Sequence, residues 1–194
     1  MRTGRAAVAM ARFGNSDPNW CGIGDNSGCE FEIGTVRVVA AGVDAAPFAI
    51  DALVLEQDTY LLMVDDGIIR EPAESIAALA DELVRQQPLS GGTVIALETR
   101  PIQLLAVVHD IEFEPTWSDQ WITLALDNIV TECIRHEIES LAMRPLAYRH
   151  SGFPIDRFIE LLRNVLAQPT GVLRRIWLVW PDSHSPGVNG VGNT

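Results

Sequence analysis

Short apolar runs alternate with longer amphipathic stretches through most of the chain, and this alternation limits the fold more than any other feature of the sequence. The short runs are rich in β-branched residues and predict strands. They lie at residues 35–41, 50–56, 60–64, 93–97, 104–109, 141–147 and 175–180. The longer stretches carry apolar residues at helical spacing and predict helices. They lie at residues 72–86, 118–140 and 154–168. The expected fold is therefore α/β, a three-layer α/β/α sandwich around a mixed, largely parallel central sheet.

Prolines and one serine mark the ends of the predicted helices. Pro72 and Pro154 each stand at a first helical position, where a residue without an N–H group is tolerated. Pro88 follows the first helix and stops it. Ser118 is the expected N-cap of the long second helix, because its hydroxyl can accept a free backbone N–H of the first turn.

The charged residues exclude several classes of chemistry. All 14 basic residues are arginines, so the chain has no lysine for a Schiff base, a P-loop or a general base. The 26 acidic residues leave a net charge of −12, and a field of that sign disfavours non-specific binding of nucleic acid. No run reaches the roughly 18 apolar residues of a membrane span, so no membrane partner is expected. We predict neither a cofactor nor a bound metal.

At 194 residues the chain can form one domain with a substantial core. Turn formers dominate residues 1–30, interpreted as a loop-rich N-terminal extension, and glycine, proline and serine dominate 183–194, interpreted as a flexible tail. The folded domain is therefore expected at residues 31–182. The three cysteines cannot form an even disulfide framework. Cys21 and Cys29 could pair across a loop, but reduced thiols and a cytoplasmic location are predicted.

Three loops are expected at the edge of the sheet where ligands bind. In open α/β sheets, ligands lie beyond the carboxyl ends of the strands, where the chain passes into helices. The loops that meet this condition are residues 56–71, 109–118 and 147–154. These three segments are therefore the loops that qualify by this rule.

Four short segments resemble those of the macro domain, a module that binds ADP-ribose. Residues 51–54 (DALV) are similar to the strand that enters its ligand loop, and residues 92–95 (GTVI) to its glycine-led strand. Residues 107–109 (VVH) and 145–154 (PLAYRHSGFP) are similar to a later strand end and to its glycine-rich phosphate loop. The resemblance spans residues 35–181 and implies the macro-domain fold, an architecture that the N-terminal domain of leucine aminopeptidase shares.

The loops depart from this family more than the scaffold does. In the family, backbone N–H groups of the glycine-rich loop wrap the diphosphate, and glycine permits their close approach. Here Ala147, Arg149 and Ser151 replace three of those glycines, and Gly152 remains. The family's asparagine pair falls near Glu56, Gln57 and Asp58, and the two carboxylates there would repel a diphosphate. The residues of the ligand loops therefore differ from those of the family, whereas the order of strands and helices is similar.

The resemblance and the loop positions together imply a set of ligand-binding residues. In this set Arg149 is expected to meet phosphate through a charge-assisted contact, and Trp117 to cover the base. The complete set is Asp51, Asp66, Gly67, Arg70, Trp117, Ala147, Tyr148, Arg149, His150, Ser151 and Gly152.

Three functions are consistent with these residues. The first is a divergent macro-domain-like module that binds ADP-ribose or a related nucleotide ligand through altered phosphate loops. The second is a non-catalytic protein-interaction or assembly module that has lost ligand binding and forms a homo-oligomer or binds another protein. The third is an ADP-ribosyl hydrolase, which would need a water held between the ligand's phosphate and ribose. No activated nucleophile or paired-acid site is visible, so the catalytic residues are unknown and catalysis is not required.

Two histidines allow both a chemical and a structural interpretation. His150 lies with Arg149 and Asp156 at one loop-to-helix junction, where a histidine near a carboxylate can do acid–base work. Alternatively, these residues form a solvated loop, and Asp156 simply favours a helix N-terminus. His109 could point into the cleft or could be a satisfied core histidine. The structural interpretation is favoured for both.

Cys133, His136 and Glu137 are spaced to share one face of the long helix, as metal ligands can be. Cys133 also falls on the apolar stripe of that helix, so a buried thiol beside solvated charges is the favoured interpretation. Trp177 and Trp180 point to opposite faces of the last predicted strand. If that strand lies at an edge, an exposed tryptophan there would mark a partner surface.

Overall fold

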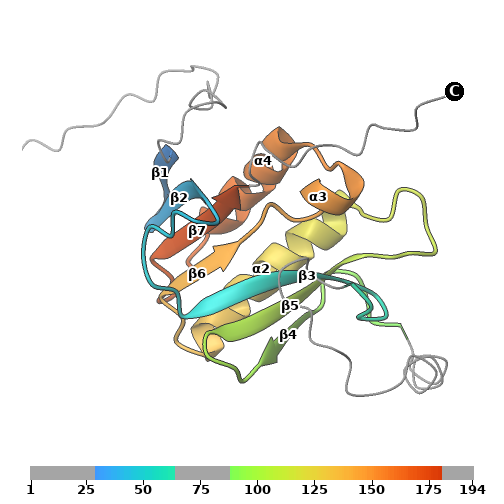
Figure 1. The fold of residues 1–194 in the computed structure, drawn as a ribbon, viewed down its shortest axis with the longest axis horizontal. Helices are drawn as coiled ribbons and strands as arrows, with labels where there is room; N and C mark the ends of the chain where they lie inside the picture. The colour runs from blue at the N-terminus through green and yellow to red at the C-terminus, as the bar shows by residue number, and fades with distance from the viewer. Residues whose placement is uncertain (1–28, 64–87, 181–194) are drawn as a thin grey trace, which may run out of the picture.

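The computed structural model describes residues 29–63 and 88–180, and these contain one mixed sheet of seven strands (Figure 1). The strands are β1 (Cys29–Ile33), β2 (Val36–Gly42), β3 (Ala52–Asp58), β4 (Val94–Leu97), β5 (Ile102–His109), β6 (Ser140–Met143) and β7 (Arg175–Trp180). Their order across the sheet is β1-β2-β7-β6-β3-β5-β4. β1 and β4, at the two margins, pair antiparallel to their neighbours, and the five inner strands run parallel. The predicted mixed, largely parallel sheet is confirmed.

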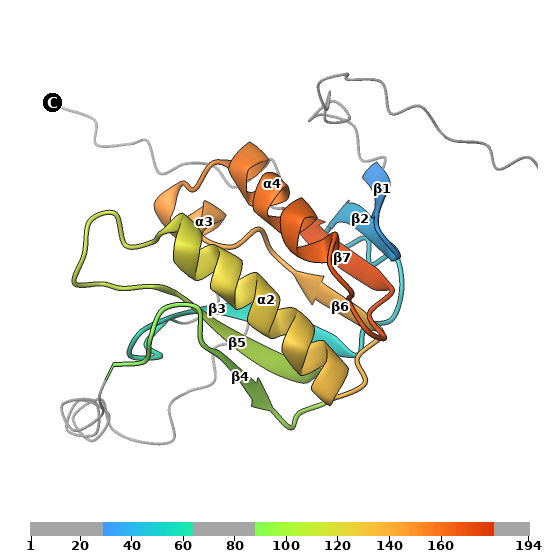
Figure 2. The ribbon, with the colours of Figure 1, turned by 180° about the vertical axis from the view of Figure 1, so that it is seen from behind.

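Two long helices lie side by side on one face of this sheet (Figures 1 and 2). They are α2 (Asp119–Arg135) and α4 (Ile155–Leu166), and a single turn, α3 (Tyr148–Ser151), precedes α4. The buried stripes of both long helices pack on the apolar residues that the inner strands direct toward this face. The largest fully buried side chains include Phe153, Phe158, Leu104, Ile122, Leu141, Leu162 and Ile176. Among the described residues, no helix has the length and apolarity that a membrane span requires.

The α/β sandwich predicted from the alternation of strands and helices is confirmed, with one predicted helix outside the described residues. That helix is the one at residues 72–86. The N-cap prediction is also confirmed, because the Ser118 hydroxyl accepts the backbone N–H of Trp121 at 3.2 Å. The same helix ends at Arg135 and not at residue 140. Its backbone turns at Glu137, which takes the left-handed φ of 54°.

Two segments differ from the strand predictions for physical reasons. Residues 60–63 form a turn and not a strand, because the Asp58 carboxylate accepts the backbone N–H groups of Tyr60 at 2.7 Å and Leu62 at 3.0 Å. β1 was not predicted, and its first two residues fall in the segment interpreted as an extension. It pairs along β2, and Phe31 packs against the core.

The opposite face of the sheet carries a second, smaller apolar cluster. Trp177, Val179 and Ala142 are buried there, and Phe48, Ile50 and Leu53 pack against them. The Trp177 indole N–H donates to the carbonyl oxygen of Ala41 at 3.1 Å. β7 lies between β2 and β6, so the condition for a partner-binding tryptophan, that this strand lies at an edge, is not met. Trp180, half-buried, packs against the main core instead.

Candidate functional site

The carboxyl ends of β3, β5 and β6 lie at one edge of the sheet because the three strands are parallel. The segment Pro145–Pro154 leaves this edge after β6 and leads into α4 (Figure 1). The segment 110–118 leaves it after β5 and leads into α2. Two of the three predicted ligand loops therefore meet at one place, as the sequence predicted. The second half of the third, residues 64–71, lies outside the described residues.

The turn Pro145–Pro154 has a left-handed residue at each end of α3. Ala147 has φ 59° and Gly152 has φ 68°. The Ala147 carbonyl oxygen accepts the Ser151 hydroxyl at 2.7 Å and the Phe153 backbone N–H at 3.1 Å. A left-handed conformation costs a residue with a Cβ atom about 1 kcal/mol relative to glycine. Alanine at 147 therefore preserves a backbone path for which glycine is the usual residue.

A buried carboxylate joins three segments at this edge. The Glu56 side chain, 10% exposed, leaves the end of β3, and its Oε1 accepts the backbone N–H of Ala147 at 3.1 Å. Its Oε2 lies 3.0 Å from Nε2 of His109, whose side chain is 3% exposed. The other ring nitrogen of His109, Nδ1, lies 3.2 Å from the Thr116 hydroxyl. His109 is therefore a core histidine with both ring nitrogens engaged, as the favoured interpretation had it.

Two aromatic contacts hold the turn in place. The Trp117 ring meets Phe153 edge-on, with 4.7 Å between ring centroids and 77° between planes. The Trp117 indole N–H donates to the Ser151 carbonyl oxygen at 3.3 Å. The Tyr148 ring lies 6.4 Å from that of Trp180. Trp117, in the segment before α2, and Trp180, at the end of β7, therefore hold the turn by aromatic packing.

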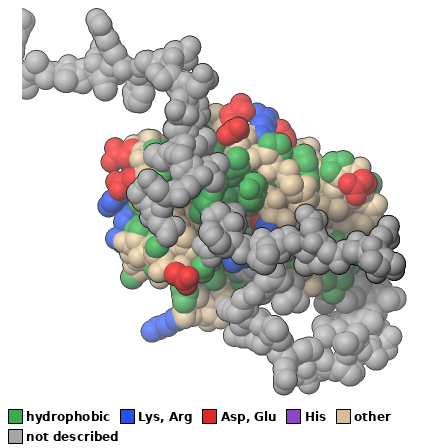
Figure 3. Space-filling view, turned by 45° about the horizontal axis from the view of Figure 1, so that its top comes forward, with side chains coloured by type: hydrophobic (Ala, Val, Ile, Leu, Met, Phe, Trp, Pro, Cys, Tyr) green, Lys and Arg blue, Asp and Glu red, His purple; other side chains and the backbone are tan. Residues whose placement is uncertain are grey.

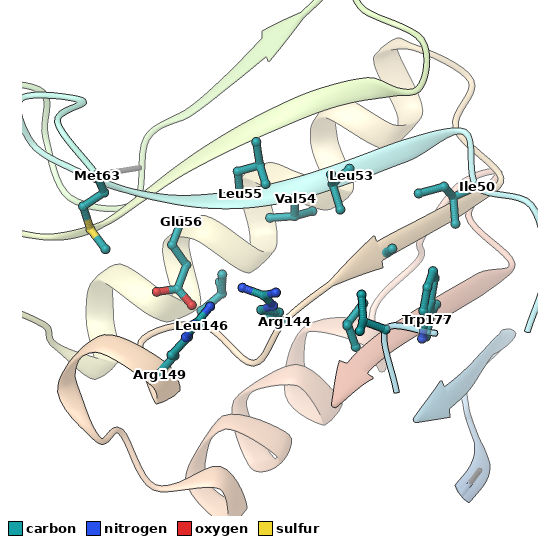
Figure 4. A pocket seen from close by; sticks show the side chains of 13 residues that line it. Ile50, Leu53, Val54, Leu55, Glu56, Met63, Arg144, Leu146, Arg149 and Trp177 are labelled. Atoms are coloured by element: carbon teal, nitrogen blue, oxygen red, sulfur yellow. The ribbon is translucent and has the colours of Figure 1, made fainter. Parts of the chain in front are cut away.

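A pocket of about 290 Å³ extends from this turn along the sheet face opposite α2 and α4 (Figure 4). Its walls are mainly apolar, and its polar lining comes from Glu56, Arg144 and Arg149. Figure 4 shows Glu56 and Arg149 pointing toward one another, the first from β3 and the second from α3. The apolar lining residues are Val43, Ile50, Leu53, Val54, Leu55, Met63, Ala142, Leu146, Trp177 and Val179. In the space-filling view, apolar side chains gather near the middle of the visible face, and charged side chains lie mostly toward its margins (Figure 3).

The structure brings together most of the predicted ligand residues that it describes. Six of them share the turn, His150 by its backbone position, and Trp117 contacts the turn directly. The other five are Ala147, Tyr148, Arg149, Ser151 and Gly152. Asp66, Gly67 and Arg70 lie outside the described residues.

Asp51 is not part of this group. It lies at the amino end of β3, at the edge of the sheet opposite the turn. Its Oδ2 accepts the Ser140 hydroxyl at 2.7 Å and the Ser140 backbone N–H at 2.9 Å. These contacts assign Asp51 to the joining of β3 and β6 and not to the ligand edge.

Sequence reasoning missed the role of Glu56 and did not name Arg144. From the sequence, Glu56 is only one of two carboxylates at residues 56–58, at the end of a predicted strand. A signal was nevertheless present, because an acidic residue that ends an apolar parallel strand must find a partner when it is buried. Its partners, Ala147 and His109, lie 91 and 53 residues away and could not be identified from local pattern.

The cluster on α2 is a buried thiol beside charged residues, as favoured from the sequence. Cys133 is fully buried, and burial, followed by the charges of Glu132 and Asp51, raises the pKa of its thiol from 9.0 to about 12. The Glu132 carboxylate pairs with Arg135 at 2.9 Å and His136 at 3.3 Å. Within the described parts of the chain, no three His, Cys, Asp or Glu side chains are placed to hold a metal ion.

Comparison with known proteins finds similarity of structure only. No family model matches the chain, and no curated protein matches it in sequence. The Oceanobacillus iheyensis macrodomain with ADP superposes with a TM-score of 0.57 at 15% identity, covering 79% of this chain and 89% of that one. The macrodomain of Thermus aquaticus DarG superposes with a TM-score of 0.56 at 18% identity, covering 76% and 99%. The macrodomain of Mycobacterium tuberculosis DarG gives a TM-score of 0.56 at 15% identity, covering 74% and 98%. At these identities the likeness is one of fold.

Proposed function

We propose that this chain, which has the macrodomain fold, binds ADP-ribose or a related nucleotide at the carboxyl edge of its sheet. The observation that carries the proposal is the turn Pro145–Pro154, which keeps a left-handed residue at 147 and at 152 although only the second is glycine. The turn lies beside a tryptophan and an arginine at the edge where open α/β sheets bind ligands. The O. iheyensis macrodomain has been solved with ADP, and a variant of it with ADPR.

Arginine side chains bind the phosphate here, in place of the backbone N–H groups of a glycine-rich loop. Arg149 is exposed on the turn, and both Arg149 and Arg144 line the pocket. A guanidinium group offers a planar pair of N–H donors that matches two phosphate oxygens, and such charge-assisted bonds are stronger than neutral ones. These two local positive charges counter the net charge of −12, which would otherwise disfavour an anionic ligand.

Trp117 supplies the aromatic surface for the base. Its indole N–H donates to the Ser151 carbonyl and its ring forms an edge-to-face pair with Phe153, so the ring has a fixed orientation at the turn. A ring fixed in advance loses little conformational entropy when a planar base stacks on it.

Calorimetric titration with ADP-ribose tests the proposal. The parent chain is expected to release or absorb heat with a saturable isotherm. Arg149→Ala is expected to weaken binding about tenfold, because it removes one charge-assisted contact. Arg163→Ala, on the exposed side of α4 where its guanidinium lies over Phe31, is the matched control and should bind like the parent. An absence of heat at millimolar ADP-ribose would reject the proposal, and parent-like binding by Arg149→Ala would reject the phosphate role of that side chain.

A protein-interaction module is the second candidate, and one observation favours it. Ile111 and Phe113, on the segment between β5 and α2, are 57% and 60% exposed, and large apolar side chains at that exposure are typical of contact surfaces. On this candidate the same calorimetry gives no heat, and light scattering on the same sample reports a stable oligomer. Binding of ADP-ribose by a monomer would rule it out.

A further inference from the structure

We propose that Glu56 is a specificity-determining residue that competes with the ligand's phosphate for the backbone N–H of Ala147. The inference rests on the proposed function, since it concerns how the same edge treats an anionic ligand. On this inference, the site prefers ligands whose anionic group contacts arginine side chains over ligands whose anionic group must contact the backbone N–H of Ala147. A ligand that needs that amide for a diphosphate is disfavoured by the chain's own carboxylate.

The first argument is occupancy. Oε1 of Glu56 already accepts the Ala147 N–H at 3.1 Å. An N–H group has one hydrogen, so a phosphate oxygen can take it in full only if the carboxylate leaves. Ala147 is fully buried and has a left-handed backbone that directs this N–H toward the end of β3. The donor that a diphosphate would use at this point of the turn is therefore satisfied from inside the molecule.

The second argument is that the carboxylate is held and is not free to swing aside. His109 lies 3.0 Å from Oε2 of Glu56, and both side chains are at least nine-tenths buried. His109 is itself anchored through Nδ1, 3.2 Å from the Thr116 hydroxyl. Thr116 directly precedes Trp117, so the segment that presents the aromatic ring also supports the carboxylate. To displace Glu56, a ligand must break contacts on both carboxylate oxygens.

The third argument is charge. A phosphate placed at the Ala147 amide would lie within a few ångströms of a carboxylate in a partly buried setting, where like charges repel more strongly than in water. Arg144 and Arg149 line the same pocket and offer an attractive alternative for an anion. The arrangement favours contact with the guanidinium groups and disfavours contact with the amide.

Two substitutions separate occupancy from charge. Glu56→Ala frees the amide and removes the charge, and is expected to raise the affinity for ADP-ribose about tenfold, which corresponds to about 1.4 kcal/mol. Glu56→Gln removes the charge, while its amide oxygen can still accept the Ala147 N–H, so a smaller increase is expected. Adenosine, which has no phosphate, should bind both variants as it binds the parent. Glu160→Gln, which neutralises an exposed carboxylate paired with Arg157 on α4, is the matched control and should change neither affinity.

Calorimetry with both ligands, on variants shown to be folded by circular dichroism, gives outcomes that separate the two proposals. If the parent binds ADP-ribose and neither variant binds it more tightly, the role of Glu56 is rejected and the proposed function stands. If the parent gives no heat but Glu56→Ala binds, the role of Glu56 is supported and the proposed function of the parent fails. If none of the three binds, both are rejected. Should Glu56→Ala fail to fold, Glu56→Gln decides alone, and an unchanged affinity then overturns the inference.

Discussion

At each end of β3, a carboxylate accepts a backbone N–H from β6 or from the turn after it, but the surroundings of the two carboxylates differ. At the amino end, Asp51 accepts the backbone N–H of Ser140, the first residue of β6. At the carboxyl end, Glu56 accepts the backbone N–H of Ala147, just after β6. Asp51 also accepts a hydrogen bond from the Ser140 hydroxyl, whereas Glu56 lines a pocket together with Arg144 and Arg149. At one edge, therefore, the carboxylate joins β3 to the start of β6, and at the other it joins β3 to the turn and also lines a pocket.

Asp51→Ala is expected to have the largest effect on stability. The substitution leaves the backbone N–H groups of Ser140 and Glu139 without this acceptor, and the Ser140 hydroxyl keeps only the Ala49 carbonyl oxygen. Hydrogen bonds to a charged group contribute more than neutral ones, so the free energy of unfolding should fall by about 2 kcal/mol. Urea denaturation measures this loss. The affinity for ADP-ribose should not change, and a variant that kept its stability but lost the ligand would return Asp51 to the binding site.

The stability of the protein at alkaline pH tests the burial of Cys133, a thiol whose pKa is also raised by the charge of Asp51. Burial, Glu132 and Asp51 raise the pKa of this thiol to about 12 in the folded chain, against 9.0 when it is exposed. A group whose pKa is higher in the folded state contributes stability that is complete below the unfolded pKa and is lost as pH rises through the folded one. The free energy of unfolding should therefore fall by about 1.4 kcal/mol between pH 8 and pH 10 through this group. Cys133→Ala should lack this part of the decline, and equal declines in parent and variant would contradict the burial of the thiol as its cause.

Thr116→Val tests whether the carboxyl end is held by its supporting residues. The hydroxyl that meets Nδ1 of His109 is lost, and the shape of the side chain is kept. We expect a loss of about 1 kcal/mol in the free energy of unfolding. Because the histidine no longer fixes Glu56 as firmly, affinity for ADP-ribose should rise, by less than in Glu56→Ala. A fall in affinity would mean that the segment acts on the ligand through Trp117 alone.

Trp117→Phe should have the smallest effect. The exchange removes the indole N–H that donates to Ser151 at 3.3 Å, and it keeps an aromatic ring against Phe153. Stability should fall by about 0.5 kcal/mol, at the low end for a neutral hydrogen bond. ADP-ribose should bind within about threefold of the parent, because a phenyl ring can still stack. Trp117→Ala is the comparison variant, and equal affinities for the two would show that the ring does not cover the base.

Local patterns predicted both long helices and every described strand except β1, and contacts between residues far apart in the chain account for the misplaced residues. The strand ending at His109 and the helix beginning after Ser118 follow from periodicity and capping, which act within a few residues. The turn 145–154 lies at the carboxyl edge of the sheet, as the sequence predicts, because parallel strands share their carboxyl ends. The partner of Glu56 depended on how β3 and β6 are set side by side, which no local rule specifies. The separation of Asp51 from the turn follows once β3 is known to begin at Ala52, since the strand's whole length lies between them.

The antiparallel strands at the two margins limit how copies of this sheet can meet. β1 and β4 are five and four residues long, so each offers few main-chain groups to a neighbouring chain. Glu30 and Glu32 alternate along β1, and a second β1 laid against the first would bring acidic side chains close to acidic side chains. Growth of one continuous sheet from molecule to molecule is thereby disfavoured. Copies of this chain that associate would do so through their faces or loops, among them the exposed segment that carries Ile111 and Phe113.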